Sequence, residues 1–364
     1  MDSLSFNEFF QGQSLNFLLR AIRVALEEDG LELTSRAVFP AGHRSKIALI
    51  AKQDAILAGL SLVPIVMAEA QRFELAAKNP AISRISPDPS ARSVPLVRPE
   101  PGERSAQSGP IASNQEPDWP AWPDWSWQPV ATEGAAVKNG DRLAIIEGST
   151  RLLLKAERIM LNFITHMSGV ATLTARYVQA LEGSGVRLLD TRKTLPGLRA
   201  AEKYAVQVGG GCNHRFSLED MLMLKDNHID AAGSISKAVG LLRAAYAPCP
   251  PIEVECRNQA EVLEAVAAGA DRIMLDNMEP EAIGEAMSVI PRSIETEVSG
   301  GVNLENIAAL VRGPWVNGSG QSASGSERGV SCSGQALRRP PDFISVGRIT
   351  HSAPQVDFSI RFLK

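Results

Sequence analysis

Six short apolar runs in the C-terminal half of the chain, each followed at once by polar or small residues, constrain the fold more than any other feature. Amphipathic stretches of helical length, 234–247, 259–268 and 280–289, lie between several of these runs. Alternating strands and helices predict a parallel sheet. A barrel is favoured over an open sheet, because all strand ends of a barrel converge on one face. The six runs end at Asp190, Asn227, Arg257, Asn277, Gly301 and Gly347.

The first part of the chain has a different pattern and predicts a separate, small α/β domain. Residues 15–28 have apolar side chains at helical spacing, strand-like runs follow at 46–51 and 55–62, and a second helical pattern continues to about residue 77. Residues 134–148 contain an Asn-Gly turn between apolar stretches, which is typical of a hairpin. A long amphipathic segment, 149–180, is the expected hinge. The sequence therefore predicts an N-terminal α/β domain over 1–150 and a barrel over 151–364.

Two stretches differ in composition from the rest and are interpreted as inserts. Residues 80–128 are rich in Pro, Ser, Arg and Glu, and such sequence buries too little apolar area to offset its ordering entropy, so most of it is expected to be disordered. Residues 312–340 are rich in Gly and Ser and are expected to be flexible, in a helix-to-strand connection away from the site. Tryptophans near the end of the first insert are expected to pin it back onto the domain or to stack on a partner: Trp119, Trp122, Trp125 and Trp127.

Composition limits the class of ligand. The net charge is only −4, which argues against a general nucleic-acid binder or a membrane-surface protein, and no run approaches the length of a membrane span. The four cysteines form no C-x-x-C pair, so a structural zinc site and a disulfide framework are not expected. We expect reduced thiols, a cytoplasmic location and a small ligand.

Positive charge is concentrated in the stretch Asp190–His228, which opens as the first of the six runs ends and includes the second. Guanidinium groups pair with carboxylate and phosphate through two hydrogen bonds, and lysine acts as a point charge, so this stretch predicts an anionic ligand. The run Gly209–Gly211 adds bare backbone that a ligand could approach. A solvated charged face is the simpler alternative, but the cations follow directly on a strand and on a glycine turn. They are Arg192, Lys193, Arg199, Lys203, His214, Arg215 and Lys225.

Acidic and small residues follow the later runs. Glu255 and Asp276 suit Mg²⁺ or sugar hydroxyls, and salt bridges to Arg192 or Lys225 are the open alternative. His214 and His228 fit anion binding better than general-base catalysis, because neither has a nucleophile beside it. Neither a phosphate-loop motif nor a dinucleotide-binding motif is present. Small residues that could bind phosphate through backbone N–H groups occur at the last two strand ends: Ser299, Gly300, Gly301, Ser345 and Gly347.

These motifs resemble the quinolinate phosphoribosyltransferase family over nearly all of the chain outside the two inserts. The resemblance implies a small N-terminal α/β domain and a C-terminal open α/β barrel in a homodimer. It also implies a reaction that joins quinolinate to phosphoribosyl pyrophosphate with Mg²⁺, giving nicotinate mononucleotide, pyrophosphate and CO₂ in NAD biosynthesis. The segments that carry it are 157–172, 190–215, 224–228, 252–255, 275–277, 299–302 and 344–354.

The resemblance also implies how quinolinate is bound. The segment 28–35 is a compressed form of the family's pattern, which leaves the first loop of the N-terminal domain in question. The two carboxylates of quinolinate are assigned to Arg192, His214, Arg215 and Lys225, joined by Arg158 of the partner subunit.

The remaining roles concern phosphoribosyl pyrophosphate. The resemblance assigns Lys193 to this substrate, Glu255 and Asp276 to its ribose hydroxyls and metal, and the loops 299–301 and 345–347 to its 5′-phosphate. One alternative is a paralogous transferase for another acidic heterocycle, which the intact sequences LKDNH and TLPGLR disfavour. The other is a non-catalytic anion-binding barrel, which is disfavoured because no charged strand-end residue is missing.

Overall fold

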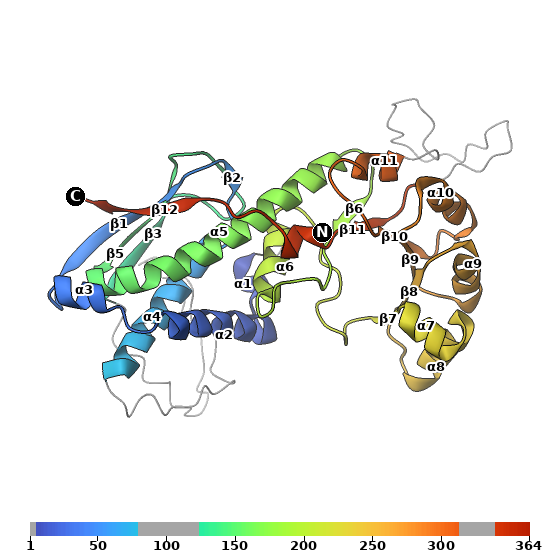
Figure 1. Ribbon diagram of the computed structural model, residues 1–364, viewed down its shortest axis with the longest axis horizontal. Coiled ribbons are helices and arrows are strands. Elements are labelled where there is room, and N and C mark those ends of the chain that lie inside the picture. Colours follow the sequence, from blue (N-terminus) through green and yellow to red (C-terminus); the bar gives the residue numbers. More distant parts are fainter. Residues whose placement is uncertain (1–4, 79–123, 313–338) are drawn as a thin grey trace, which may run out of the picture. The chain divides into compact units, whose positions relative to one another are not determined.

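The computed structural model describes residues 5–78, 124–312 and 339–364 (Figure 1). It contains two compact units, residues 1–169 with 355–364 and residues 170–354. This division differs from the predicted boundary at 150/151 in two ways. The long helix α5 (Thr150–Ala180) continues without a break across residue 169, and the last ten residues belong to the first unit. No helix in the described ranges is long and apolar enough to cross a bilayer.

The first unit is built on a four-stranded antiparallel sheet with the order β12-β1-β5-β3. The strands are β1 (Arg44–Ala51), β3 (Trp125–Pro129), β5 (Arg142–Ser149) and β12 (Phe358–Leu363). Ile47, Ala48 and Leu49 of β1 are all buried, so both faces of the sheet are covered at this inner strand, whereas buried and half-buried residues alternate from Ala144 to the end of β5. Its other helices and short strands are α1 (Phe6–Phe9), α2 (Gly12–Asp29), α3 (Leu33–Val38), η1 (Leu60–Leu62), α4 (Val63–Lys78), β2 (Ala55–Ile56) and β4 (Ala136–Val137).

Three predictions for this unit need correction. The hairpin over 134–148 was wrong, because β4 pairs with β2, whereas β5 pairs with β1 and β3. The strand expected over 55–62 is only β2, and a 3-10 turn follows it. The insert was extended too far, since 125–129 form a strand and Trp125 Nε1 donates to Gln71 Oε1 at 3.1 Å. That hydrogen bond confirms the expected pinning for Trp125, whereas Trp119, Trp122 and the rest of 80–123 lie outside the described residues.

The second unit confirms all six predicted strands. They pair in parallel in the order β6-β11-β10-β9-β8-β7, and β6 and β7 do not pair with each other, so the α/β unit is open, as expected; beyond β6 only Cys212 continues the sheet, through a parallel bridge to Leu189. Helices α7 to α10 follow one another along one side of it (Figure 1). The strands are β6 (Arg187–Leu189), β7 (Leu222–Leu224), β8 (Ile252–Cys256), β9 (Arg272–Asp276), β10 (Glu295–Ser299) and β11 (Phe343–Ser345).

The connections of this unit are helical. Helices α8, α9 and α10 confirm the three amphipathic stretches, and the second insert connects α11 to β11, although 313–338 lie outside the described residues. Asn258 and Ser234 cap α9 and α8 by accepting backbone N–H groups. The helices are α6 (Arg199–Val208), α7 (Asp226–Ala232), α8 (Ile235–Ala245), α9 (Gln259–Ala268), α10 (Pro280–Val289), α11 (Ile307–Arg312) and α12 (Arg348–His351).

The two faces of the six-stranded sheet differ in polarity because side chains alternate along a strand. Ile252, Val254 and Cys256 of β8 lie on the apolar face, which packs against helices such as α9. Residues of the other parity form what we call the polar face. Strand pairing places Glu255 beside Met274, and Ser299 beside Asp276. The residues of the polar face therefore lie in rows that run across the strands. Its members in β8, β9 and β10 are Glu253, Glu255, Arg272, Met274, Asp276, Glu295, Glu297 and Ser299.

The pairing of β12 with β1 leads to a stability prediction. Phe358 is 4% exposed and Phe362, on the same strand, is 46% exposed. Phe358→Ala should therefore lower the stability of the first unit by about 3 kcal/mol, because it leaves a cavity in the core. Phe362→Ala, the matched control, should change it by less than about 0.5 kcal/mol. Urea unfolding measures both values, and equal losses would show that β12 does not pack as described.

Candidate active site

All but one of the predicted site residues lie in the second unit, at or just beyond the carboxyl ends of its parallel strands. This is the edge at which α/β proteins bind ligands. The exception is Arg158, which is exposed on the part of α5 that belongs to the first unit. The site described below therefore consists of the second unit alone.

The segment after β6 is held beside the sheet by backbone hydrogen bonds. Cys212 forms a bridge with Leu189, and the N–H of Asp190 donates to the carbonyl of Cys212 at 3.1 Å. Two of the preceding glycines are required for packing. A Cβ atom on Gly209 would lie 2.5 Å from the carbonyl oxygen of Ala171, and one on Gly211 would lie 2.9 Å from Thr174 Cγ2, both in α5. Gly210 is exposed, so only this residue keeps the bare backbone that the sequence predicts for the run.

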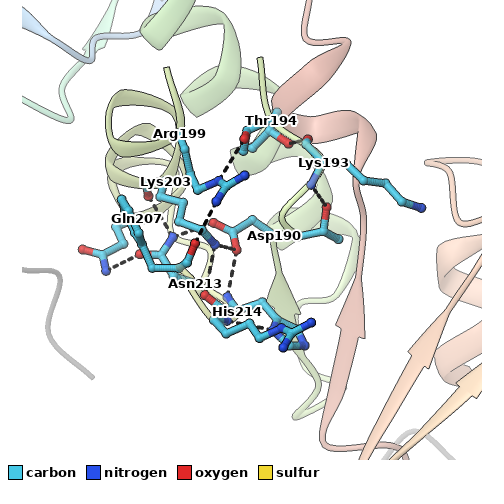
Figure 2. A network of polar contacts seen from close by, with 12 residues as sticks. Asp190, Lys193, Thr194, Arg199, Lys203, Gln207, Asn213 and His214 are labelled. Carbon is cyan, nitrogen blue, oxygen red and sulfur yellow. Dashed lines mark hydrogen bonds and ion pairs between the residues drawn. The ribbon is translucent and has the colours of Figure 1, made fainter. Parts of the chain in front are cut away.

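One predicted ligand cation is buried instead. Lys203 is 0% exposed, and its Nζ lies 2.5 Å from Asp190 Oδ1, also fully buried (Figure 2). Burial raises the pKa of Asp190, and Lys203 opposes this shift. Burial lowers the pKa of Lys203, and Asp190 opposes that shift. Lys203 is therefore a structural cation with its own counter-ion, and we remove it from the anion-binding set.

Three guanidinium groups lie close together at this edge. Burial lowers the pKa of Arg199 and of Arg215, and the charge of Arg192 lowers both further. Arg199 donates to Thr194 Oγ1 and to the carbonyl of Phe216, each at 3.1 Å, and Arg215 donates to the carbonyl of Met221 at 3.0 Å. Among the described residues, no ion pair includes Arg192 or Arg215, and Arg192 Nε is buried without a hydrogen-bond partner. Guanidinium groups that are partly buried and lie near one another without a direct ion pair favour an anionic ligand.

Lys225 and Glu255 form the salt bridge that the sequence left open as an alternative. Lys225 Nζ lies 2.5 Å from Glu255 Oε2, with side chains 45% and 15% exposed. This pair is accessible enough to exchange partners when a ligand arrives. His228 Nδ1 accepts the backbone N–H of Lys225 at 3.1 Å. It therefore caps the start of α7, and the predicted anion binding by this histidine stays a prediction.

The loop after β10 fixes the acid at the end of β9. Gly300 has φ +90°, and a Cβ atom there would lie 2.2 Å from Asn277 Oδ1. Asn277, itself at φ +52°, donates from its side chain to Asp276 Oδ2 at 2.9 Å and from its backbone to the carbonyl of Ser299 at 2.9 Å. Only glycine at 300 permits this contact. The first task of this loop is thus to orient the carboxylate of Asp276.

Lys193 lies over the turn that follows β11. A Cβ atom on Gly347 would lie 3.0 Å from Lys193 Cδ, and the carbonyl of Lys193 accepts the Thr350 hydroxyl at 2.7 Å. Ser345 Oγ is buried and has no hydrogen-bond partner among the described residues. The structure therefore joins a lysine to a turn of small residues, which is the combination expected for a phosphate.

A buried acidic pair below this edge was missed from the sequence. His214 Nε2 lies 3.2 Å from Glu253 Oε2 and 3.4 Å from Glu297 Oε2, and both glutamates are fully buried. Glu253 lies two residues before Glu255, and Glu297 lies two residues before Ser299. Residues two apart on a strand share a face, so the predicted site residues Glu255 and Ser299 were the available signal for the two buried acids.

This cluster has the donor types of a divalent metal site, and one ligand atom from each residue lies within 4.8 Å of the others. His214 Nδ1 accepts the backbone N–H of Arg215 at 2.7 Å, so the ring proton is on Nε2, the atom that a metal ion would need. Nε2 lies nearest the two carboxylates, and burial raises the pKa of Glu253. The imidazole ring is therefore held between the backbone of Arg215 and the two buried acids.

The chain is similar to known proteins along both units. Residues 170–316 match the family model "Quinolinate phosphoribosyl transferase, C-terminal domain", and 121–168 match the N-terminal domain model. A probable nicotinate-nucleotide pyrophosphorylase [carboxylating] of Bacillus subtilis is 40% identical over 63% of this chain and 70% of its own length. Quinolinate phosphoribosyltransferase [decarboxylating] 1 of Nicotiana glauca is 32% identical over 93% of this chain and 81% of its own.

Solved structures agree with this similarity. The nicotinate-nucleotide pyrophosphorylase of Francisella tularensis is 28% identical, with a TM-score of 0.70 over 98% of this chain and 99% of that one. The parallel α/β unit with cations and acids at its strand ends, together with these relatives, defines a pentosyltransferase of NAD biosynthesis. The chain belongs to the quinolinate phosphoribosyltransferase family.

The contact between Gly300 and Asn277 predicts a specific loss of activity. Gly300→Ala should reduce kcat by about tenfold or more, because the new methyl group displaces Asn277 and with it the carboxylate of Asp276. Gly233→Ala is the control: residue 233 has φ +94°, but its Cβ position has no heavy atom within 4 Å. Steady-state kinetics and thermal unfolding of both variants separate the two effects: backbone strain affects both variants, whereas displacement of Asn277 affects only Gly300→Ala. Equal activities would contradict the role of the contact.

Proposed function

We propose that the chain carries out the reaction of its family on its own substrates. It transfers the phosphoribosyl group of phosphoribosyl pyrophosphate to the ring nitrogen of quinolinate with loss of CO₂, and releases nicotinate mononucleotide and pyrophosphate. The observation that carries this proposal is the set of guanidinium groups that form no ion pair among the described residues, beside the two acids at one sheet edge. A dianionic base and an activated, polyanionic sugar are the ligands that such an edge requires.

Quinolinate presents two adjacent carboxylates, and Arg192 and Arg215 supply guanidinium groups that form no ion pair among the described residues. Lys225 joins them by leaving Glu255, with which it now shares a half-exposed salt bridge. The contact of His214 with quinolinate stays a prediction. In this structure its ring faces Glu253 and Glu297, and it supports Arg215 by accepting that residue's backbone N–H.

Phosphoribosyl pyrophosphate is bound by the two acids, Lys193 and the two loops of small residues. Departure of pyrophosphate develops positive charge at C1′, and the carboxylates of Glu255 and Asp276 stabilise that charge. Lys193 stabilises the negative charge of the leaving group. The loops Ser299–Gly301 and Ser345–Gly347 bind the 5′-phosphate through backbone N–H groups.

Mg²⁺ fits this donor set. Glu255 Oε1 and Asp276 Oδ1 accept no hydrogen bond from the described residues, and carboxylate oxygens are the ligands that this cation prefers. We propose that these two residues hold Mg²⁺, directly or through water, where it would offset charge on the pyrophosphate.

Positioning accounts for the rest of the chemistry. The arginines hold the ring nitrogen against C1′, which replaces a bimolecular encounter with an oriented one. Once the nitrogen is quaternised, the ring accepts the electron pair left by the departing CO₂, and solvent supplies the proton to that carbon. No protein nucleophile is required for either step.

We also propose a homodimer in the cytoplasm. Arg158 is exposed on α5 and has no recorded partner among the described residues, which suits an arginine that reaches the quinolinate site of a second copy. The thiols of Cys212, Cys249 and Cys256 are free, as expected in a reducing compartment.

Product analysis tests the reaction. Full-length protein supplied with phosphoribosyl pyrophosphate, Mg²⁺ and quinolinate labelled in the carboxylate next to the nitrogen should release labelled CO₂ and nicotinate mononucleotide in equal amounts. Nicotinate, which lacks that carboxylate, is the control base and should give no product. Turnover of another acidic heterocycle in place of quinolinate would support a paralogous transferase and overturn the proposal.

The division of labour among the cations predicts two different kinetic defects. Arg215→Ala should raise the KM for quinolinate by about tenfold to a hundredfold, because it removes a charge-assisted pair, and should leave the KM for phosphoribosyl pyrophosphate nearly unchanged. Lys193→Ala should show the opposite preference. The control is Arg257→Ala, since Arg257 also follows a strand but is already paired with Asp230 and Glu261. Equal damage toward both substrates in either variant would contradict the assignment.

A further inference from the structure

We propose that Asp190 and Lys203 are positioning residues that hold the segment Asn213–Arg215 in the place where it binds quinolinate. This inference rests on the proposed function, because it concerns the quinolinate half of that reaction. Neither residue is assigned to substrate, and neither has an atom exposed to it. Their action is through residue 214 and its neighbours.

The pair holds the backbone of residue 214 at both of its polar groups. The N–H of His214 donates to Asp190 Oδ1 at 2.8 Å, and Lys203 Nζ donates to the carbonyl of His214 at 3.0 Å. The two charged groups also bind each other at 2.5 Å. The carboxylate of Asp190 thus accepts the N–H of residue 214, and the ammonium group of Lys203 donates to its carbonyl (Figure 2). Together the two hydrogen bonds fix the position and the direction of the chain at this residue.

Asn213 locks the same segment from the other side. Its Nδ2 donates to Asp190 Oδ2 at 2.7 Å and to the carbonyl of Lys203 at 2.9 Å, and its Oδ1 accepts Gln207 Nε2 at 2.7 Å. Both carboxylate oxygens of Asp190 are therefore used on two consecutive residues. A segment so fully bonded has one conformation, so Arg215, the next residue, leaves it in one direction.

Helix α6 links this segment to the other cationic loop. Lys203 and Arg199 lie one helical turn apart on α6, so they project from the same side of the helix. Arg199 donates to Thr194 Oγ1, next to Lys193, and to the carbonyl of Phe216, next to Arg215. The helix thereby holds the loops that contain Lys193 and Arg215 in register.

Stability alone does not explain a fully buried ion pair. Replacing such a pair by apolar groups is often neutral or stabilising, because the desolvation of two charges offsets their attraction. Among the described residues, however, the backbone N–H of residue 214 bonds only to Asp190, and its carbonyl bonds only to Lys203. These two hydrogen bonds determine where the next residue, Arg215, begins. Placement of the quinolinate-binding arginine is the property that the pair provides.

The test compares single and charge-neutral variants of the full chain. Lys203→Met and Asp190→Asn each leave one buried charge unpaired and should lower the unfolding midpoint. The double variant D190N/K203M removes both charges and should recover part of that loss. Its KM for quinolinate should nevertheless stay raised by about tenfold or more, because the donor to the carbonyl of residue 214 is missing and an amide has one acceptor oxygen where the carboxylate has two. Its KM for phosphoribosyl pyrophosphate should change by less than about twofold.

Two controls separate positioning from folding. Lys203→Arg keeps a cation and should restore much of the quinolinate KM. Glu69→Gln, which loses the carboxylate that Arg23 and Arg72 share in the first unit, should lower stability without changing either KM. All kinetics are measured well below each variant's own unfolding midpoint.

The outcomes separate this inference from the proposed function. Recovery of the quinolinate KM in D190N/K203M together with stability would show a purely structural pair and overturn the inference. An equal rise in both KM values would overturn it as well. If the unmodified protein turned over no quinolinate in the same assay, the proposed function would fail. Calorimetric titration with quinolinate would then test the inference directly, and it would be overturned by equal affinities of the unmodified and double-variant proteins.

Discussion

The period-two alternation of side chains along parallel strands is the constraint on which the site depends. It places Glu253 and Glu255 on the same face, and likewise Glu297 and Ser299, and in each pair the first residue is deeper in the unit. The deeper residues have no access to water and must find partners in the protein. The outer residues lie at the strand ends, where a ligand can reach them. One strand pattern thus produces a buried polar layer with a binding surface above it.

The ionisable groups buried inside the unit and those at the strand ends differ in how their charge is balanced. The buried groups are neutralised in place: Asp190 pairs with Lys203, and His214 lies between Glu253 and Glu297. At the outer level, Arg192 and Arg215 form no ion pair among the described residues, and burial together with the charge of Arg192 lowers the pKa of Arg215. An incoming dianion relieves the repulsion between the two cations. The same protein interior that makes the deep pairs costly without partners makes the outer cations bind an anion strongly.

Much of this was predictable from the sequence, because the signals are local. The apolar runs and their polar ends identified all six parallel strands, and the cations, acids and small turns that follow them lie at one sheet edge. What failed depended on partners distant in the chain. The hairpin over 134–148 was wrong because β2 and β1 compete for its two strands, and β12 returns to β1 from the far end of the chain. Lys203 was predicted to bind an anionic ligand, but it is buried in an ion pair with Asp190, which lies 13 residues earlier in the chain.

A crystal structure of the full chain with quinolinate bound tests the central claim most directly. The account predicts that both carboxylates of quinolinate contact the guanidinium groups of Arg192 and Arg215, beyond the ends of β6 and β7, with the ring nitrogen directed toward Glu255 and Asp276. Quinolinate bound elsewhere in the chain, or these arginines paired with protein carboxylates in its presence, would contradict the account.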